Sequence, residues 1–170
     1  MSRSNPRKPK PRTTRATAQI VCEGFTEEAF CKYLKSLYAR DCGVSVAIHN
    51  ARGGSPQDII KTALNRKGYD RTVVLFDADK PLPDSWRKKS RSAGHHLVIA
   101  DPCIEGLLLA ILRRPVPDTT NECKRALDAL LQGASKNDPK NYATLLPKSL
   151  LDEGTHPQLL TLRKVFSPDP

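Results

Sequence analysis

At 170 residues the chain is long enough for one domain with a full core, and its 28 Lys and Arg against 18 Asp and Glu give a net charge of +10. This charge favours an anionic partner, most commonly nucleic acid, although a basic protein that is merely soluble stays an alternative. The five cysteines form no Cys-x-x-Cys pair, which argues against a zinc site and favours reduced thiols in a cytoplasmic protein. No apolar run approaches the roughly 20 residues of a membrane span, which argues against a membrane anchor.

Residues 1–17 form a basic segment with six Lys or Arg, three Pro and no acidic residue. Such a composition cannot bury a core, so we expect a disordered tail. The tail is either an arm that contacts phosphates or a solvated end without a partner, and the sequence leaves both open.

From residue 18 to residue 115, strand and helix patterns alternate. Short apolar or alternating runs predict strands over 18–22, 44–48, 71–76 and 96–100. Apolar residues at helical spacing, with start and stop signals, predict helices over 26–39, 55–67, 83–93 and 103–112. This order predicts an α/β, Rossmann-like domain: a mostly parallel four-stranded sheet with helices on both faces. Residues 116–170 predict a C-terminal helical extension, with helices over 119–132, 138–146 and 155–166.

Acidic residues follow three of the four predicted strands. In an open parallel sheet, ligands bind at the carboxyl ends of the strands, so these acids should gather at one edge. Gathered carboxylates repel one another, and a hard divalent cation such as Mg²⁺ or Mn²⁺ relieves that repulsion. Two such ions can hold the attacking and leaving oxygens of a phosphodiester. The candidate ligands are Glu23, Glu27, Asp77, Asp79 and Glu105, with Asp101 as a further acid at this edge.

Three stretches in this order, IVCEGFTEEAF, VVLFDAD and ADPCIEGLLL, together resemble a TOPRIM domain. The Pro-Cys-x-Glu element, Pro102 to Glu105, resembles more narrowly the RloB-like group, which is related to nucleases of the overcoming-lysogenization-defect type. The resemblance covers residues 18–112. Ala100-Asp101 stands where members of that group usually have Ser-Asn, and Ile104 stands where they have Phe.

The resemblance implies a nuclease that depends on Mg²⁺ or Mn²⁺ and holds two ions. Glu23 would be a metal ligand or general acid/base, Asp77 and Asp79 would be ligands, and Glu27 and Glu105 would complete the site. Such proteins often act with an ABC-type ATPase in defence against phage, and the sequence leaves the oligomeric state open. A later lysine is also expected, to stabilise charge on the scissile phosphate. Lys136 is the first candidate and Lys140 the second.

Two basic segments are candidates for contacts to nucleic acid. Arg52 begins the stretch Arg-Gly-Gly-Ser before a predicted helix, where backbone amides could hold a phosphate or simply cap the helix. The predicted helix 83–93 is either a nucleic-acid-binding surface or a solvated face. Its basic residues are Arg87, Lys88, Lys89 and Arg91.

Two functions from different classes remain. The first is a metal-dependent nuclease that cleaves DNA or RNA. The second is a non-cleaving subunit that binds nucleic acid or an ATPase, which the small size and the altered Ala100-Asp101 element favour. A topoisomerase or primase core fits poorly, because a topoisomerase needs a nucleophilic tyrosine on a further domain and a primase needs a longer chain.

Overall fold

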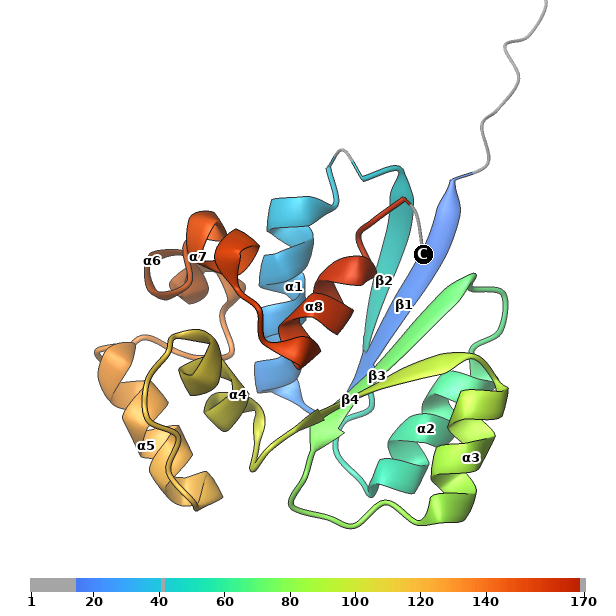
Figure 1. Ribbon diagram of the computed structural model, residues 1–170, viewed down its shortest axis with the longest axis horizontal. Coiled ribbons are helices and arrows are strands. Elements are labelled where there is room, and N and C mark those ends of the chain that lie inside the picture. The colour runs from blue at the N-terminus through green and yellow to red at the C-terminus, as the bar shows by residue number, and fades with distance from the viewer. Residues whose placement is uncertain (1–14, 41, 169–170) are drawn as a thin grey trace, which may run out of the picture.

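The protein is built on one sheet, and its computed structural model describes residues 15–40 and 42–168. Four parallel strands lie in the order β2-β1-β3-β4 (Figure 1). They are β1 (Ala16–Cys22), β2 (Val44–Asn50), β3 (Arg71–Asp77) and β4 (His95–Ala100). The predicted α/β fold and the predicted strands are thereby confirmed. Residues 1–14 of the predicted tail lie outside the described residues, and β1 already begins at Ala16.

The strands β1 and β3 are apolar on both faces because the sheet is covered on both sides. Along β1, Ile20 and Cys22 pack into one core cluster, whereas Val21 packs into a second cluster on the opposite face with Val74 of β3. Continuous apolar runs of this kind are typical of parallel strands with helices on both faces. The run VVLF predicted a strand, and the structure shows that this strand is a central one, paired with both β1 and β4.

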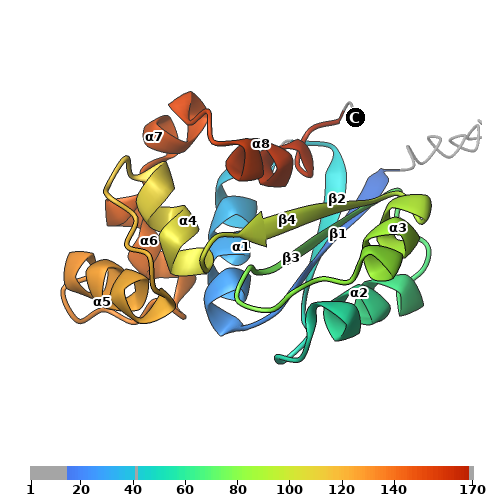
Figure 2. The same cartoon turned by 60° about the horizontal axis from the view of Figure 1, so that its bottom comes forward.

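Four helices alternate with the strands. They are α1 (Phe25–Tyr38), α2 (Pro56–Asn65), α3 (Asp84–Ser92) and α4 (Ile104–Ile111). The helices α2 and α3 lie on one side of the sheet, and α1 lies on the other (Figures 1 and 2). The helix α2 begins with a capping box, in which the Ser55 hydroxyl and the Asp58 carboxylate each accept a hydrogen bond from the other residue's backbone N–H. Helices on both faces were predicted and are confirmed.

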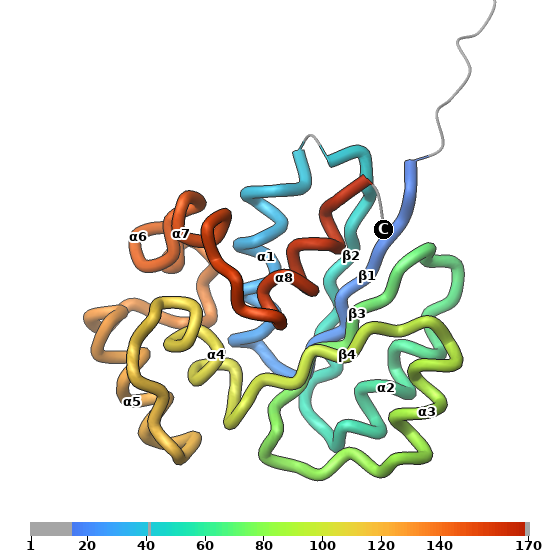
Figure 3. Tube along the Cα trace, viewed as in Figure 1, coloured from blue at the N-terminus to red at the C-terminus, as the bar shows by residue number. Residues whose placement is uncertain are grey.

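The chain after Pro117 is helical, as predicted, and it packs against the same sheet. It contains α5 (Thr120–Leu130), the 3₁₀ helix η1 (Pro139–Asn141), α6 (Tyr142–Leu145), α7 (Lys148–Glu153) and α8 (Pro157–Lys164). The helix α7 lies where no helix was predicted, and the predicted helix over 138–146 is divided between η1 and α6. The helix α8 runs back beside β4, where the Gln158 amide donates to the Ile99 carbonyl oxygen at 3.4 Å (Figure 3).

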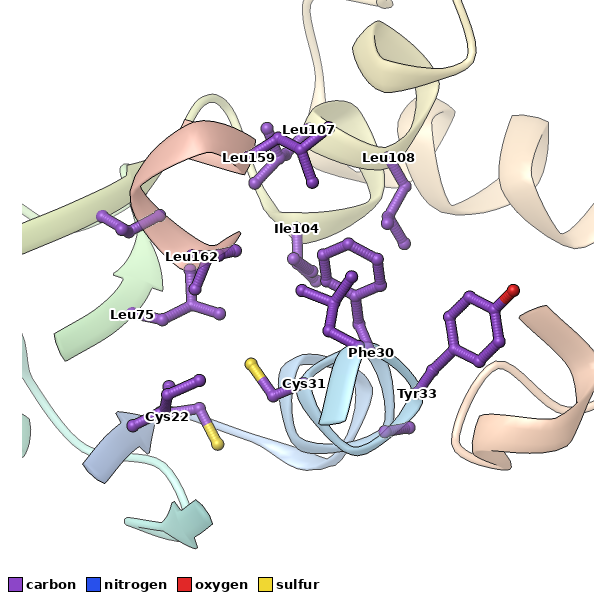
Figure 4. Close-up of a cluster of buried hydrophobic side chains, with 14 of the residues drawn as sticks. Cys22, Phe30, Cys31, Tyr33, Leu75, Ile104, Leu107, Leu108, Leu159 and Leu162 are labelled. Carbon is purple, nitrogen blue, oxygen red and sulfur yellow. The ribbon is translucent and has the colours of Figure 1, made fainter. Parts of the chain in front are cut away.

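One core cluster joins the C-terminal helices to the strands. Figure 4 shows side chains from β1, α1, β3, α4 and α8 converging in it, among them Cys22, Phe30, Leu75, Ile104 and Leu162. The C-terminal helices therefore complete the core on this side of the sheet. Within residues 15–40 and 42–168, no helix is long and apolar enough to cross a membrane.

Candidate metal-binding site

Glu23 is the first residue after β1, and three contacts hold it at the carboxyl edge of the sheet. Its Oε2 accepts a hydrogen bond from the backbone N–H of Asp77 at 3.2 Å, and its Oε1 lies 3.6 Å from the Lys80 Nζ. Its carbonyl oxygen accepts a hydrogen bond from the backbone N–H of Gly53 at 2.7 Å. The carboxylate of Glu23 is therefore tied to the end of β3, and its backbone to the loop after β2.

Asp77, the last residue of β3, connects this edge to α4. Its Oδ1 accepts a hydrogen bond from the backbone N–H of Ile104 at 2.8 Å. The residue before that helix, Cys103, makes no side-chain capping bond, so Asp77 caps α4 from another strand. Burial, and then the negative charge of Glu27, raise the pKa of the Asp77 carboxyl to about 8. Asp77 is thus a carboxyl group whose negative charge is costly unless a cation compensates it.

Two glutamates on the flanking helices are buried. Glu27 of α1 is 5% exposed and Glu105 of α4 is 2% exposed. Burial, together with the charges of Glu23 and Glu105, raises the pKa of Glu27 to about 7. Glu105 Oε2 is buried and has no hydrogen-bond partner among the described residues. A buried carboxylate oxygen is rarely left without a partner, so Glu105 Oε2 is free to take part in a further polar contact.

The sequence candidate Lys136 lies at the site, although it comes from the segment after α5. Its Nζ is 3.4 Å from Glu105 Oε1 and 3.2 Å from Asp128 Oδ1. The Tyr142 hydroxyl donates to the Lys136 carbonyl oxygen at 2.7 Å, which fixes the backbone there. The second candidate, Lys140, lies in η1 with an exposed side chain that pairs with no acid in the described part of the chain. Of the two lysines, Lys136 has the position that the nuclease hypothesis needs.

Asp79 is placed differently from the other predicted ligands. The strand β3 ends at Asp77, and residues 78–79 form a turn. The argument that Asp77 and Asp79 share a side of an extended chain therefore does not apply, because the chain is no longer extended there. Asp79 is exposed and makes no side-chain hydrogen bond or ion pair with any residue that the structure describes. Asp101 is also exposed.

The predicted ligands are suited to a hard divalent cation in chemical type. All of them offer carboxylate oxygens. Neighbouring negative charges help to raise the pKa of Asp77 and Glu27, and one oxygen of Glu105 has no hydrogen-bond partner among the described residues. Gly24 adds to the fit, since a Cβ atom there would lie 3.1 Å from Glu27 Oε2. As placed, however, no three His, Cys, Asp or Glu side chains within residues 15–40 and 42–168 form a group that could hold an ion.

The predicted nucleic-acid contacts do not lie together. Arg52 follows β2 at the carboxyl edge, and its backbone N–H donates to Asn50 Oδ1 at 2.7 Å. By contrast, Arg87 and Arg91 of α3 line a hollow with His95, at the start of β4 and thus at the opposite edge of the sheet. The exposed Lys88 and Lys89 lie on the same helix, and Lys89 Nζ is 4.6 Å from the Trp86 ring centre. Only Arg52 of this set lies beside the predicted ligands.

Sequence reasoning missed a cleft that is lined by residues of α1, β2 and the segment after α5. It has a volume of about 500 Å³. Its polar and aromatic lining comprises Phe25, Glu28, Lys32, His49, Asn50, Arg52, Arg66 and Asn137. We call it the Phe25 cleft. Phe25 lies outside the apolar stripe of α1 and on the same side of the helix as Lys32, which was the available signal. Glu28, assigned no functional role from sequence, pairs with Lys32 at 2.6 Å and accepts a bond from Asn50 Nδ2 at 2.8 Å.

Comparison with known proteins does not extend these assignments. No protein-family model, curated protein or solved structure matches the chain.

Proposed function

We propose that this protein is a nuclease of the TOPRIM type, similar to the RloB-like group, that hydrolyses phosphodiester bonds in DNA or RNA with Mg²⁺ or Mn²⁺. The observation that carries the proposal is the pair of buried glutamates, Glu27 and Glu105, next to the Glu23–Asp77 hydrogen bond. A fold that only needed stability would gain nothing from several carboxylates whose like charges repel one another at one edge of the sheet. A site for divalent cations explains them together.

The ion ligands would be carboxylates of Glu23, Glu27, Asp77 and Glu105, with Asp79 as the exposed member of the set. When bound, two ions would offset the charge of the phosphate and of the attacking and leaving oxygens. Glu23 would accept or donate the proton, because it lies at the edge and is less buried than Glu27 or Glu105. The ammonium group of Lys136, 3.4 Å from Glu105, would stabilise negative charge that develops on the scissile phosphate.

The biological setting is proposed from the RloB-like resemblance alone. It comprises an ABC-type ATPase partner and a role in defence against phage. A cytoplasmic location is proposed separately, from the cysteine pattern. These proposals do not depend on the geometry of the site, so they can fail while the nuclease proposal stands.

A non-cleaving subunit that binds nucleic acid or an ATPase is the second candidate. The observation that favours it is the placement of the acids, because those described do not form a three-ligand group and Asp79 is exposed in a turn. A protein that kept the fold and lost the chemistry would show such a loosened set.

Cleavage assays separate the two candidates. Plasmid, linear DNA and tRNA are incubated with Mg²⁺ or Mn²⁺, with the protein alone and with any ABC-type ATPase encoded beside its gene. We expect metal-dependent cleavage that Asp77→Asn abolishes. The exposed residue Glu153 provides the matched control, since Glu153→Gln removes one carboxylate far from the site. Stabilisation by Mn²⁺ without cleavage of any substrate would favour the non-cleaving subunit.

A further inference from the structure

The Phe25 cleft is framed by segments that also hold the proposed metal site, although none of the predicted ligands lines it. One wall is α1, which begins two residues after Glu23, and another is the loop that Gly53 ties to the Glu23 carbonyl oxygen at 2.7 Å. On the far side the Thr26 hydroxyl donates to Asn137 Oδ1 at 3.0 Å, and Asn137 directly follows Lys136. A chain that lay in the cleft would therefore lie next to the segments that carry Glu23 and Lys136.

The charge of the cleft is positive. Lys32 is neutralised by Glu28 at 2.6 Å, but the guanidinium groups of Arg52 and Arg66 form no salt bridge with the residues that the structure describes. Both arginine side chains are exposed. Guanidinium groups recognise phosphate oxygens well, because their planar N–H donors match two oxygens at once. The cleft is thus suited to an anion that carries phosphates.

The aromatic ring in the cleft points to more than a phosphate. Phe25 is 63% exposed, although it is one of the most apolar side chains of the protein. It stands at the start of α1, on the same side as Lys32, and it belongs to none of the apolar clusters formed by the described residues. An exposed aromatic ring between cationic side chains is typical of surfaces on which nucleic-acid bases stack.

We propose that the Phe25 cleft binds a single-stranded segment of nucleic acid next to the scissile phosphate, with one base stacked on Phe25 and the flanking phosphates on Arg52 and Arg66. The position of this segment next to the scissile phosphate rests on the proposed nuclease function, whereas its binding in the cleft does not. The segment is single-stranded because a base inside a duplex has both faces covered by its neighbours. A base must be unstacked before it can lie against the ring of Phe25.

The test is binding in EDTA, where cleavage is silent. Fluorescent single-stranded oligonucleotides, a duplex of the same sequence and an abasic strand are titrated with the protein. We expect the single strand to bind about tenfold more tightly than the abasic strand, since stacking on aromatic side chains contributes on this scale. Phe25→Leu should remove that advantage and leave abasic binding unchanged, whereas Phe25→Trp should keep it. Leu160→Ala is the control, because Leu160 is an exposed apolar residue of α8 outside the cleft.

Salt dependence tests the two arginines. Arg52→Gln and Arg66→Gln should each weaken binding and reduce the slope of log affinity against log salt by about one. Lys61→Gln removes a positive charge from the exposed surface of α2, outside the cleft, and should leave the slope unchanged. Equal binding of duplex and single strand, or equal loss of slope in Lys61→Gln, would overturn the proposal. So would full competition by polyglutamate, which would identify an acidic peptide as the ligand.

The binding test and the cleavage test can contradict one proposal without contradicting the other. Selective single-strand binding that depends on Phe25, without cleavage by any metal-loaded sample, would contradict the nuclease and support the cleft. Metal-dependent cleavage with no effect of Phe25→Leu on binding or rate would support the nuclease and contradict the cleft.

Discussion

The Glu23 carboxylate accepts a hydrogen bond from the backbone N–H of Asp77, 54 residues later in the chain, with 3.2 Å between Oε2 and the nitrogen. Asp77 in turn accepts a bond from the N–H of Ile104 at 2.8 Å. Two polar bonds thus link the end of β1, the end of β3 and the start of α4, at the edge where parallel sheets bind ligands.

Glu23→Gln should reduce cleavage by about a hundredfold or more, because the neutral amide is a weaker ligand for a divalent cation than a carboxylate and cannot take up a proton. The amide oxygen of glutamine can still accept the Asp77 N–H, so the melting temperature should stay within about 3 °C of the unchanged protein. Plasmid cleavage and a thermal melt on the same preparation measure both. Full activity of this variant would contradict the assignment of Glu23.

Lys136→Met should lower cleavage and also stability, because it leaves the buried Glu105 without its cation at 3.4 Å. An unpaired buried acceptor costs about 1–3 kcal/mol, and more when it is charged. Lys136→Arg should recover much of the stability. The matched control is Lys140→Met, which removes an exposed lysine four residues away. Equal activity of the Lys136→Met and Lys140→Met proteins would show that Lys136 has no catalytic role.

The metal-free protein should become less stable as the pH rises. The folded-state pKa values of Asp77 and Glu27, about 8 and about 7, lie above the ordinary value of about 4 that the unfolded chain has. The folded state therefore binds more protons, and the free energy of unfolding falls as the pH increases from about 4 through these folded-state pKa values.

Thermal melts in EDTA at about pH 5 and about pH 8 measure this effect, which we expect to amount to several degrees. Mn²⁺ should restore the melting temperature at the higher pH, because it binds the ionised carboxylates. Glu27→Gln cannot ionise at position 27, so it should flatten the pH dependence and weaken the response to Mn²⁺. An unchanged pH dependence in that variant would contradict the raised pKa of Glu27.

Gly24→Ala should disturb the site while sparing the fold. The backbone of Gly24 has a φ of −140°, which alanine adopts without strain, but its Cβ would lie 3.1 Å from Glu27 Oε2. Glu27 must then move by a few tenths of an ångström. We expect weaker stabilisation by Mn²⁺ and slower cleavage at a nearly unchanged melting temperature in EDTA. A large drop of that melting temperature would instead assign Gly24 to folding.

The cysteines should be inert and dispensable for catalysis. Burial raises the pKa of the Cys22 thiol far above its ordinary value and that of Cys103 to about 12, so neither forms a reactive thiolate near neutral pH. Iodoacetamide should label mainly Cys42, because the other four cysteines are buried. Cys22→Ala should keep its cleavage activity. Rapid labelling of Cys22 or Cys103 in the native protein would contradict the packing described above.

The sequence by itself determined the order of strands and helices and the edge at which the acids lie. Apolar runs such as VVLF favour a buried strand, and right-handed crossovers bring the carboxyl ends of parallel strands to one edge, so Glu23 and Asp77 were expected at the same edge. The amphipathic stripe of α1 was likewise predicted from a local pattern, the helical spacing of its apolar residues. These features depend on local pattern, which a single sequence carries.

Only the tertiary structure decided which distant groups meet there. The position of Lys136 beside Glu105 depends on how the chain returns after α5. The turn at residues 78–79 takes Asp79 out of the extended strand. The Phe25 cleft is assembled from separate segments of the chain. The burial of Glu27 and Glu105 likewise results from packing of the flanking helices. Such contacts join residues far apart in the chain, and no local pattern of charge or hydrophobicity specifies their distances.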